Sequence, residues 1–223
     1  MNLSIRELYK ILKQEFEVPH IRKLKPVEEL VLTILSQNTS DRNRDLAWKR
    51  LRERFPDLEK IINAKVEEIE DIIKPAGLYK QKAKRIKEGL TLIKRKFGKL
   101  EIPLKGKNLY DFLINIKGVG PKTAAVVALF SYGEPYFPVD IHIFRVARRI
   151  PLANGKTREE VQEKLTHLVP DHLKMELHLL LIELGRKYCR PRPKCTDCPL
   201  RGFCEYAKKI GRQITGGSKV AGC

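Results

Sequence analysis

Lys122 is the residue of this 223-residue chain whose setting most suggests chemistry, because it follows a glycine-rich hairpin and begins an apolar helix. The segment Ile116 to Val127 reads IKGVGPKTAAVV. Gly118 and Gly120 allow positive φ and close approach of the backbone to a ligand, and Pro121 suits the first position of a helix. The partial positive charge at the start of a helix disfavours a further cation. We therefore predict a lowered pKa for Lys122, which would make its amine a nucleophile.

The segment before this hairpin also has a helical pattern. Asn108 is a candidate cap, and apolar residues recur from Leu109 to Ile116. The whole unit is therefore predicted to be helix, hairpin, helix, a motif that often contacts only the phosphate backbone. From this segment alone, Lys122 could be either a nucleophile or a solvated lysine that pairs with phosphate.

Asp140 is the second candidate for chemistry. It lies in FPVDIHIFRVARRI, residues 137 to 150, an otherwise apolar and basic stretch with a helical pattern after the aspartate. An isolated aspartate at this position would usually cap the helix, and a catalytic carboxylate is the alternative. His142 is either a partner of the aspartate or a satisfied core histidine.

Four cysteines near the carboxy-terminal end have the spacing C-x5-C-x2-C-x5-C: Cys189, Cys195, Cys198 and Cys204. No signal peptide or long apolar run is apparent, so we expect an intracellular protein in which thiols bind metal rather than form disulfides. One Cys-x-x-Cys pair with two outlying cysteines favours a 4Fe-4S cluster over zinc. The fifth cysteine, Cys223, is expected to be a free thiol on a disordered end.

The composition is strongly basic, with 45 Lys and Arg against 27 Asp and Glu, a formal charge of +18 and a pI near 9.8. Such a charge is expected of a protein that neutralises phosphates, although ribosomal and membrane-surface proteins share it. Most lysines in runs such as residues 80–87 are interpreted as solvated.

Caps and apolar periodicity predict helices throughout and no strand. A capping box of Ser4 with Glu7 opens the first helix, and Pro26 and Asp41 open the next two. Further helical patterns cover residues 66–73, 82–97, 158–168 and 172–184. We predict an all-α protein of one domain or two small ones.

Taken in order, the hairpin, its lysine, VDIHIFRV and the four-cysteine loop resemble the endonuclease III family of DNA glycosylases. The resemblance covers nearly the whole chain. It includes two segments of the amino-terminal half, ILSQNTSD at residues 34–41 and AGLYKQKA at residues 76–83. The spacing of the first two cysteines departs from the family, because relatives commonly have six intervening residues and this chain has five.

The resemblance implies two helical lobes with a DNA-binding cleft between them. Residues 22–133 would form a helical barrel that carries the helix-hairpin-helix motif. Residues 1–21 and 134–212 would form the lobe that holds the cluster, and residues 213–223 would be a disordered tail.

Roles for individual residues also follow from the resemblance. Lys122 would attack the sugar C1′ and Asp140 would support departure of the base. Leu78 would wedge into the duplex, and either Gln37 or Asn38 would fill the gap left by the flipped nucleotide, because relatives usually carry glutamine where this chain has Asn38. The four cysteines would hold a 4Fe-4S cluster. Further DNA contacts are expected from two groups, the hairpin and the cysteine loop: Gly118, Val119, Gly120, Thr123, Arg190, Arg192 and Lys194.

The function implied is that of a base-excision-repair glycosylase with AP lyase (β-elimination) activity on oxidised or ring-saturated pyrimidines. Its partner would be double-stranded DNA with damaged bases or abasic sites, and we expect a monomer near the nucleoid, with no membrane partner. The alternatives are a mismatch glycosylase for uracil or thymine opposite guanine, and a non-catalytic DNA-binding module. The sequence does not identify the excised bases.

Overall fold

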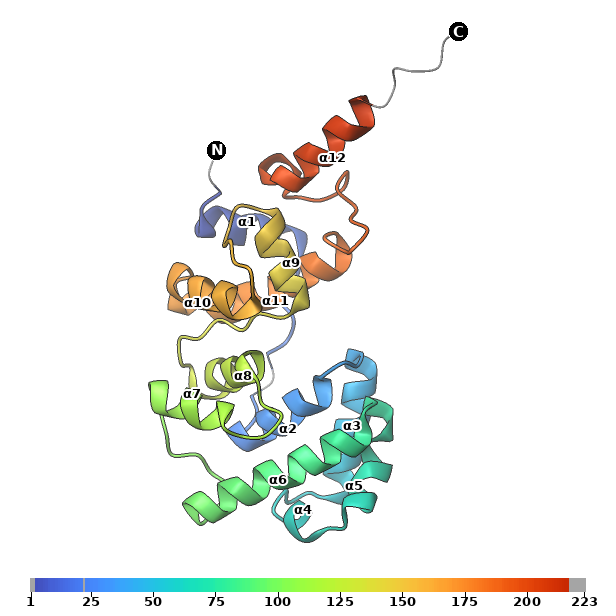
Figure 1. Cartoon of the computed structure of the whole chain (residues 1–223), viewed down its shortest axis with the longest axis vertical. Helices are drawn as coiled ribbons and strands as arrows, with labels where there is room; N and C mark the ends of the chain where they lie inside the picture. Colours follow the sequence, from blue (N-terminus) through green and yellow to red (C-terminus); the bar gives the residue numbers. More distant parts are fainter. Residues whose placement is uncertain (1–2, 22, 217–223) are drawn as a thin grey trace. The chain divides into compact units, whose positions relative to one another are not determined.

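The computed structural model describes residues 3–21 and 23–216, and within these ranges every regular element is a helix (Figure 1). The prediction of an all-α protein is confirmed. Contacts between Cα atoms divide the chain into two compact units, Arg22–Glu134 and Met1–Ile21 with Pro135–Cys223. Within the described ranges, the helices are too short or too polar to cross a membrane.

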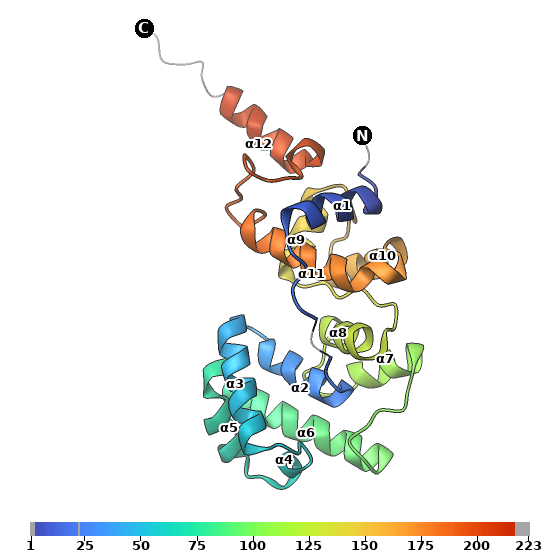
Figure 2. The ribbon, with the colours of Figure 1, turned by 180° about the vertical axis from the view of Figure 1, so that it is seen from behind.

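In the unit Arg22–Glu134, the described residues 23–134 form seven α-helices and one 3-10 turn, and Figure 2 shows these helices from behind. These are α2 (Pro26–Ser36), α3 (Asp41–Arg54), α4 (Lys60–Asn63), α5 (Val66–Ile73), η1 (Lys74–Ala76), α6 (Tyr79–Phe97), α7 (Gly106–Ile114) and α8 (Pro121–Tyr132). Helix α5 packs against α3 and α6, while α2 packs against α8.

Helix α8 is the buried element of this unit, as its sequence predicts. Gly120 precedes it in an extended conformation and Pro121 occupies its first turn. Every residue from Thr123 to Leu129 is buried, because small and branched side chains cover all sides of the helix. Burial of these side chains from water stabilises the unit and fixes the axis of α8. The start of α8 is therefore a rigid base for the residues of its first turn.

The second unit contains α1 (Ile5–Glu15), α9 (Ile141–Arg149), α10 (Arg158–Leu168), α11 (Asp171–Lys187), η2 (Arg201–Phe203) and α12 (Glu205–Gly216). The capping box of Ser4 with Glu7 opens α1 as predicted. Leu8 and Leu12, on one face of α1, join the apolar side chains of α9 and α11 in a continuous core. This core holds α9, whose first turn follows Asp140.

Several boundaries differ from the predictions. Helix α6 begins at Tyr79 rather than residue 82, and α7 is preceded by Lys105 rather than capped by Asn108. The short helix α4 was not predicted. Helix α12 extends to Gly216, into the segment 213–223 that we expected to be disordered, and residues 217–223, with Cys223, lie outside the described residues.

Candidate active site and cysteine loop

The hairpin between α7 and α8 is a tight turn in which only the first glycine has positive φ. Gly118 has φ +83°, and a Cβ atom added there would lie 2.3 Å from Cδ of Arg85. Gly120 has φ −96° and open space around its Cα, so the positive φ that both glycines allow is adopted by Gly118 alone in this hairpin. The turn is closed by the Val119 amide, which donates to the carbonyl of Ile116 over 2.9 Å.

Lys122 lies in the first turn of α8 and its side chain is half-buried. The residues on either side of Lys122 differ in solvent exposure. Gly120 is exposed, whereas Val119 is 5% exposed and Thr123 is 4% exposed. Side chains that are this deeply buried belong to the core, so Val119 and Thr123 could reach DNA only through their backbones. DNA contacts by the hairpin amides of these residues stay a prediction.

Gln37 follows α2 and is engaged with the hairpin. Its Nε2 donates to the carbonyl of Gly118 over 3.1 Å and to Oγ1 of Thr123 over 3.4 Å. Its Oε1 accepts from a guanidinium nitrogen of Arg85 over 3.2 Å. The Gln37 amide therefore holds the hairpin through Nε2 and is itself bonded to α6 through Oε1.

Asn38 and Leu78 share an unusual backbone conformation. They have φ of 51° and 47°, and they are the non-glycine residues with positive φ within residues 3–21 and 23–216. Asparagine tolerates this left-handed conformation, but leucine does so at a cost of about 1 to 3 kcal/mol. Both residues are exposed, and the Leu78 side chain is 51% exposed although it is apolar. Strain combined with exposure of an apolar side chain points to a functional role.

Asp140 is the N-cap of α9, so the prediction that this aspartate caps the helix is confirmed. Its Oδ1 accepts the amide of Ile143 over 2.8 Å. An ionised carboxylate has acceptor sites on both oxygens, so this one bond leaves Oδ2 available to a further partner. Capping and catalysis are therefore compatible roles for Asp140.

The extended segment before Asp140 is fixed by two side chains that sequence patterns did not single out. Oγ1 of Thr166 accepts the amide of Phe137 over 3.0 Å. Nδ1 of His178, which is 4% exposed, donates to the carbonyl of Pro138 over 3.0 Å. These bonds come from α10 and α11 and set the direction in which the chain enters α9.

Helix α9 approaches α11 closely at Gly185. A Cβ atom added to Gly185 would lie 2.7 Å from Cβ of His142, a separation that real structures do not show. Nδ1 of His142 accepts from the Arg145 guanidinium over 3.1 Å. His142 therefore packs between the two helices and is hydrogen-bonded within α9, which supports the interpretation as a satisfied structural histidine.

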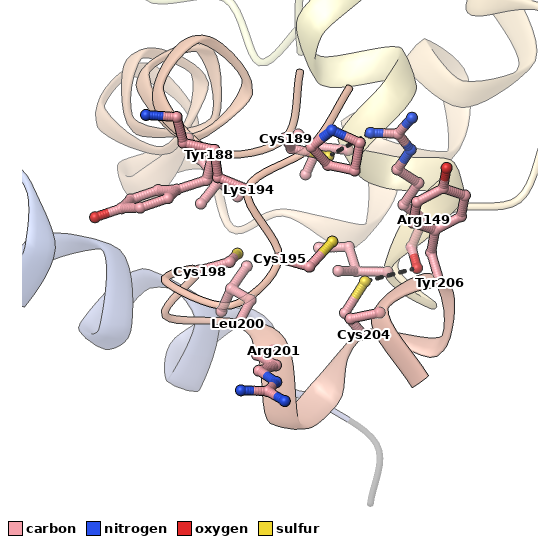
Figure 3. Close-up of a pocket in the computed structure, with 15 residues that line it drawn as sticks. Arg149, Tyr188, Cys189, Lys194, Cys195, Cys198, Leu200, Arg201, Cys204 and Tyr206 are labelled. Atoms are coloured by element: carbon pink, nitrogen blue, oxygen red, sulfur yellow. Dashed lines mark hydrogen bonds between the residues drawn. The ribbon is translucent and has the colours of Figure 1, made fainter. Parts of the chain in front are cut away.

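The four spaced cysteines line one pocket in the second unit, with a volume of about 380 Å³ that includes space open to solvent (Figure 3). Cys204 is buried and the other three are half-buried, and all four are free thiols. In Figure 3 they surround the pocket, with Arg149 and Tyr206 on the side of Cys204. Residues 15 positions apart in the sequence thus share one cavity.

Arg149 organises the backbone of this loop. Its guanidinium donates to the carbonyls of Arg190 and Pro191 over 2.6 and 3.3 Å, and it lies 3.5 Å from Sγ of Cys189. It also stacks over the ring of Tyr206, 4.3 Å from the centroid. The Arg149 carbonyl accepts from the Cys204 thiol over 3.3 Å. One residue at the end of α9 therefore contacts both ends of the cysteine motif.

The donor set suits a soft metal centre. Four sulfur ligands select zinc or an iron–sulfur cluster. Among the described residues, no three potential ligands converge closely enough to hold a single metal ion. Burial raises the pKa of the Cys198 thiol to about 11, so a metal would have to displace its proton on binding. The residues thus fit a sulfur-ligated group in chemistry and in shared location.

The basic residues expected near DNA in this loop are at the surface. Arg190, Arg192 and Lys194 are all exposed. The side chain of Arg190 donates to the carbonyl of Arg186 over 2.7 Å, which orients it along the end of α11. These side chains are accessible to a partner.

Fold and site together define a helix-hairpin-helix protein with a lysine at the start of the second helix, a capping aspartate and a four-cysteine loop. Comparisons with known proteins agree. Residues 31–171 match the family described as the HhH-GPD superfamily base excision DNA repair protein. The chain is 33% identical to endonuclease III of Thermotoga maritima over 209 residues, which is 93% of this chain and 95% of that protein. It is 36% identical to endonuclease III of Sulfolobus acidocaldarius over 92% of this chain and 93% of that protein.

A solved structure of a trapped covalent intermediate between endonuclease III and DNA is also similar. Its TM-score is 0.80 with 30% sequence identity, and the match covers 92% of this chain and 95% of that chain. The chain therefore belongs to the HhH-GPD superfamily of base excision DNA repair proteins and, within it, to the endonuclease III family. The predicted class of enzyme, a bifunctional DNA glycosylase with lyase activity, is confirmed at the level of the family.

Proposed function

We propose that this glycosylase excises oxidised or ring-saturated pyrimidines and then nicks the strand, with Lys122 as nucleophile and Asp140 as its carboxylate partner. The observation that carries the proposal is the position of Lys122, half-buried in the first turn of a helix whose next seven residues are buried, directly after a hairpin that Gln37 holds. A similar protein of the family has been trapped in a covalent intermediate with DNA. An amine that attacks the sugar accounts for both activities.

The chemistry begins with extrusion of the damaged nucleotide, because a base within the stack cannot be reached. The exposed Leu78 would enter the space in the duplex. Asn38 would occupy the gap opposite it, since the Gln37 amide is already bonded to the hairpin while Asn38 is exposed. The bonded state of Gln37 and the exposure of Asn38 support the choice of Asn38 in this proposal.

Bond breaking then follows at C1′. The neutral amine of Lys122 attacks C1′ as the N-glycosidic bond breaks and the base departs with the bonding electrons and a proton. The carboxylate of Asp140 stabilises the positive charge that grows on the sugar. The C1′–O4′ bond of this adduct then breaks as O4′ takes up a proton from water, which opens the sugar ring and leaves a protonated Schiff base between Nζ and C1′. Loss of a proton from C2′ forms a C2′–C3′ double bond and expels the 3′ phosphate, which nicks the strand.

The cysteine loop would serve binding rather than bond breaking. Cys189, Cys195, Cys198 and Cys204 would hold a 4Fe-4S cluster, whose role when bound is to cross-link the loop. The loop would then present its exposed basic residues to phosphates of double-stranded DNA: Arg190, Arg192 and Lys194. We place the enzyme as a monomer on DNA in the cytoplasm.

Borohydride trapping tests the nucleophile directly. Duplexes with one thymine glycol or one abasic site should yield a covalent adduct with the wild-type chain. The Lys122→Ala variant should yield none, and its nicking rate should fall by about 10⁴-fold or more, as when other catalytic nucleophiles are removed. Lys107→Ala is a matched control because Lys107 is exposed on α7 and paired with Asp111 at 2.5 Å. Nicking by Lys122→Ala at the wild-type rate would contradict the assignment.

A panel of single-lesion duplexes tests the substrate class. Ring-saturated and oxidised pyrimidines should be excised faster than uracil or thymine opposite guanine. A preference for the mismatched bases would replace the proposed substrate class with the mismatch alternative while leaving the lyase chemistry intact.

A further inference from the structure

Lys82 is buried although it lies in a run of basic residues. Its side chain is 1% exposed and its ammonium donates to the carbonyls of Leu35 and Ala76, both over 2.8 Å. Leu35 lies three residues before Asn38 at the end of α2, and Ala76 lies two residues before Leu78 at the end of η1. A single ammonium from α6 therefore joins the two loops that carry the strained residues.

The two loops that Lys82 joins contain Asn38 and Leu78, the residues with strained backbones. A left-handed leucine persists only where surrounding structure fixes it, since the extended and helical conformations are more favourable. The hydrogen bonds of Lys82 are made to carbonyls on the buried side of each loop, while Asn38 and Leu78 themselves are exposed. The strained residues thus face outward from a fixed base.

Arg85 extends the connection to the hairpin. It lies one turn beyond Lys82 on α6, and its guanidinium donates to Oε1 of Gln37, whose Nε2 donates to the carbonyl of Gly118. The aliphatic part of Arg85 also occupies the space that a side chain at residue 118 would fill. Two cationic side chains of α6, Lys82 and Arg85, therefore contact three loops that lie far apart in the sequence.

We propose that Lys82 and Arg85 are positioning residues that hold Asn38, Leu78 and the hairpin as one preformed surface for opening duplex DNA. The proposal rests on the proposed function, because it assigns these loops to wedge, gap and backbone contact. Preformed loops lower the cost of ordering them when the duplex is opened. Neither residue is assigned a contact with the reacting atoms.

The experiment compares two abasic-site duplexes under single-turnover conditions. In one, the site is flanked by G·C pairs, and in the other it is flanked by mismatches that already weaken the stack. Lys82→Met and Arg85→Met should lose about tenfold or more of the nicking rate on the G·C-flanked duplex and much less on the mismatched one. A general loss of stability would lower both rates by the same factor. Lys84→Met is the matched control, because Lys84 is 64% exposed on the same helix and 3.9 Å from Glu88.

A spectroscopic measurement separates positioning from chemistry. With 2-aminopurine opposite a stable abasic analogue, saturating wild-type protein should raise the fluorescence as the orphan base is displaced. Both variants should give a smaller rise at saturation, and Lys84→Met should match the wild type. Equal rate losses on the two duplexes together with a full fluorescence rise would overturn the proposal.

The outcomes distinguish this proposal from the function on which it rests. If the wild-type chain forms no borohydride adduct on either duplex, the proposed function is wrong. If the wild-type chain forms the adduct and both variants retain the wild-type ratio of rates, only the positioning role is wrong. Should Lys82→Met fail to fold, Arg85→Met decides the matter, because Arg85 is only half-buried.

Discussion

The hairpin region and the cysteine loop are held in place by different kinds of contact. The hairpin and its neighbouring loops are held by side chains of their own unit, through Gln37, Lys82 and Arg85. In the cysteine loop, Arg149 holds the backbone at one side, while four thiols line a pocket without bonding to each other. Hydrogen bonds within the unit hold the hairpin, whereas in the cysteine loop they hold the backbone and the proposed cluster would cross-link the thiols.

The largest expected effect comes from removing one of the four cysteines proposed to hold the cluster. Cys198→Ser should abolish iron–sulfur absorbance and lower the free energy of unfolding of its unit by about 5 kcal/mol or more, a fraction of the roughly 10 to 16 kcal/mol that structural zinc contributes. Hydrogen exchange should show faster opening of residues 189–204 and unchanged protection of α8. Cys223→Ser is the control, because Cys223 lies outside the spaced motif. Zinc rather than iron in elemental analysis would replace the cluster with a different centre.

The capping aspartate should show a large effect on rate and a small one on stability. Asp140→Asn keeps a side chain that caps helices about as well as aspartate, but it removes the negative charge. We expect turnover to fall by about 10² to 10³-fold, as with other electrostatic groups at reacting centres. The melting temperature should barely change. Asp140→Ala should show the same loss of rate with an additional destabilisation of about 1 kcal/mol, and normal turnover in Asp140→Asn would leave only the capping role.

Lys82 should make stability depend on pH. Burial, and secondarily the positive charge of Arg85, lower its pKa from 10.5 to about 8 in the folded chain. Between these values the unfolded chain binds more protons than the folded chain, so the free energy of unfolding rises with pH in this window. The rise should be on the order of 1 to 2 kcal/mol between about pH 8 and about pH 10.

Other groups titrate in the same pH range. The quantity to measure is therefore the difference in unfolding free energy between the wild type and Lys82→Met. Denaturant unfolding of the wild type and of Lys82→Met should be compared at each pH, with Lys84→Met as the exposed control. The wild type should gain stability relative to Lys82→Met as the pH rises. A constant difference across the window would mean that the buried ammonium keeps an ordinary pKa.

The smallest effect separates the two glycines of the hairpin. Gly118→Ala introduces a Cβ at positive φ, 2.3 Å from the Arg85 side chain, which must then move away from Gln37. We expect a loss of about 1 to 2 kcal/mol in unfolding free energy. Gly120→Ala should be nearly neutral, because its φ is negative and its Cα faces open space. Equal effects at the two positions would contradict the observed turn.

Sequence patterns predicted the elements whose signals are local. The capping box at Ser4, the proline at position 121 and the apolar surface of α8 each depend on residues within one turn, and all are found. The start of α6 was misplaced because the turn before it places Leu78 in a left-handed conformation, which sequence does not signal in a leucine. Lys105 precedes α7 without a side-chain cap, so no pattern identified that boundary.

Sequence patterns identified the candidate catalytic residues but not the side chains that hold the surrounding loops in place. Lys122 and Asp140 could be singled out by motif, and the structure adds why each is held in place. Lys82 was grouped with solvated lysines because its acceptors are backbone carbonyls, and the Leu35 carbonyl lies 47 positions away. Gln37 reaches Gly118 across 81 positions. Such contacts depend on tertiary packing, which the local pattern does not encode.

Gly185 constrains how this enzyme could be redesigned. Since any side chain there would collide with the first turn of α9, even alanine would shift the helix that begins beside the carboxylate of Asp140. Attempts to broaden the range of excised lesions by diversifying α11 should therefore leave this position untouched. The lack of a side chain at residue 185 lets α11 pack close to the start of α9, next to Asp140. Gly185 therefore affects the site although it has no side chain that could contact a substrate.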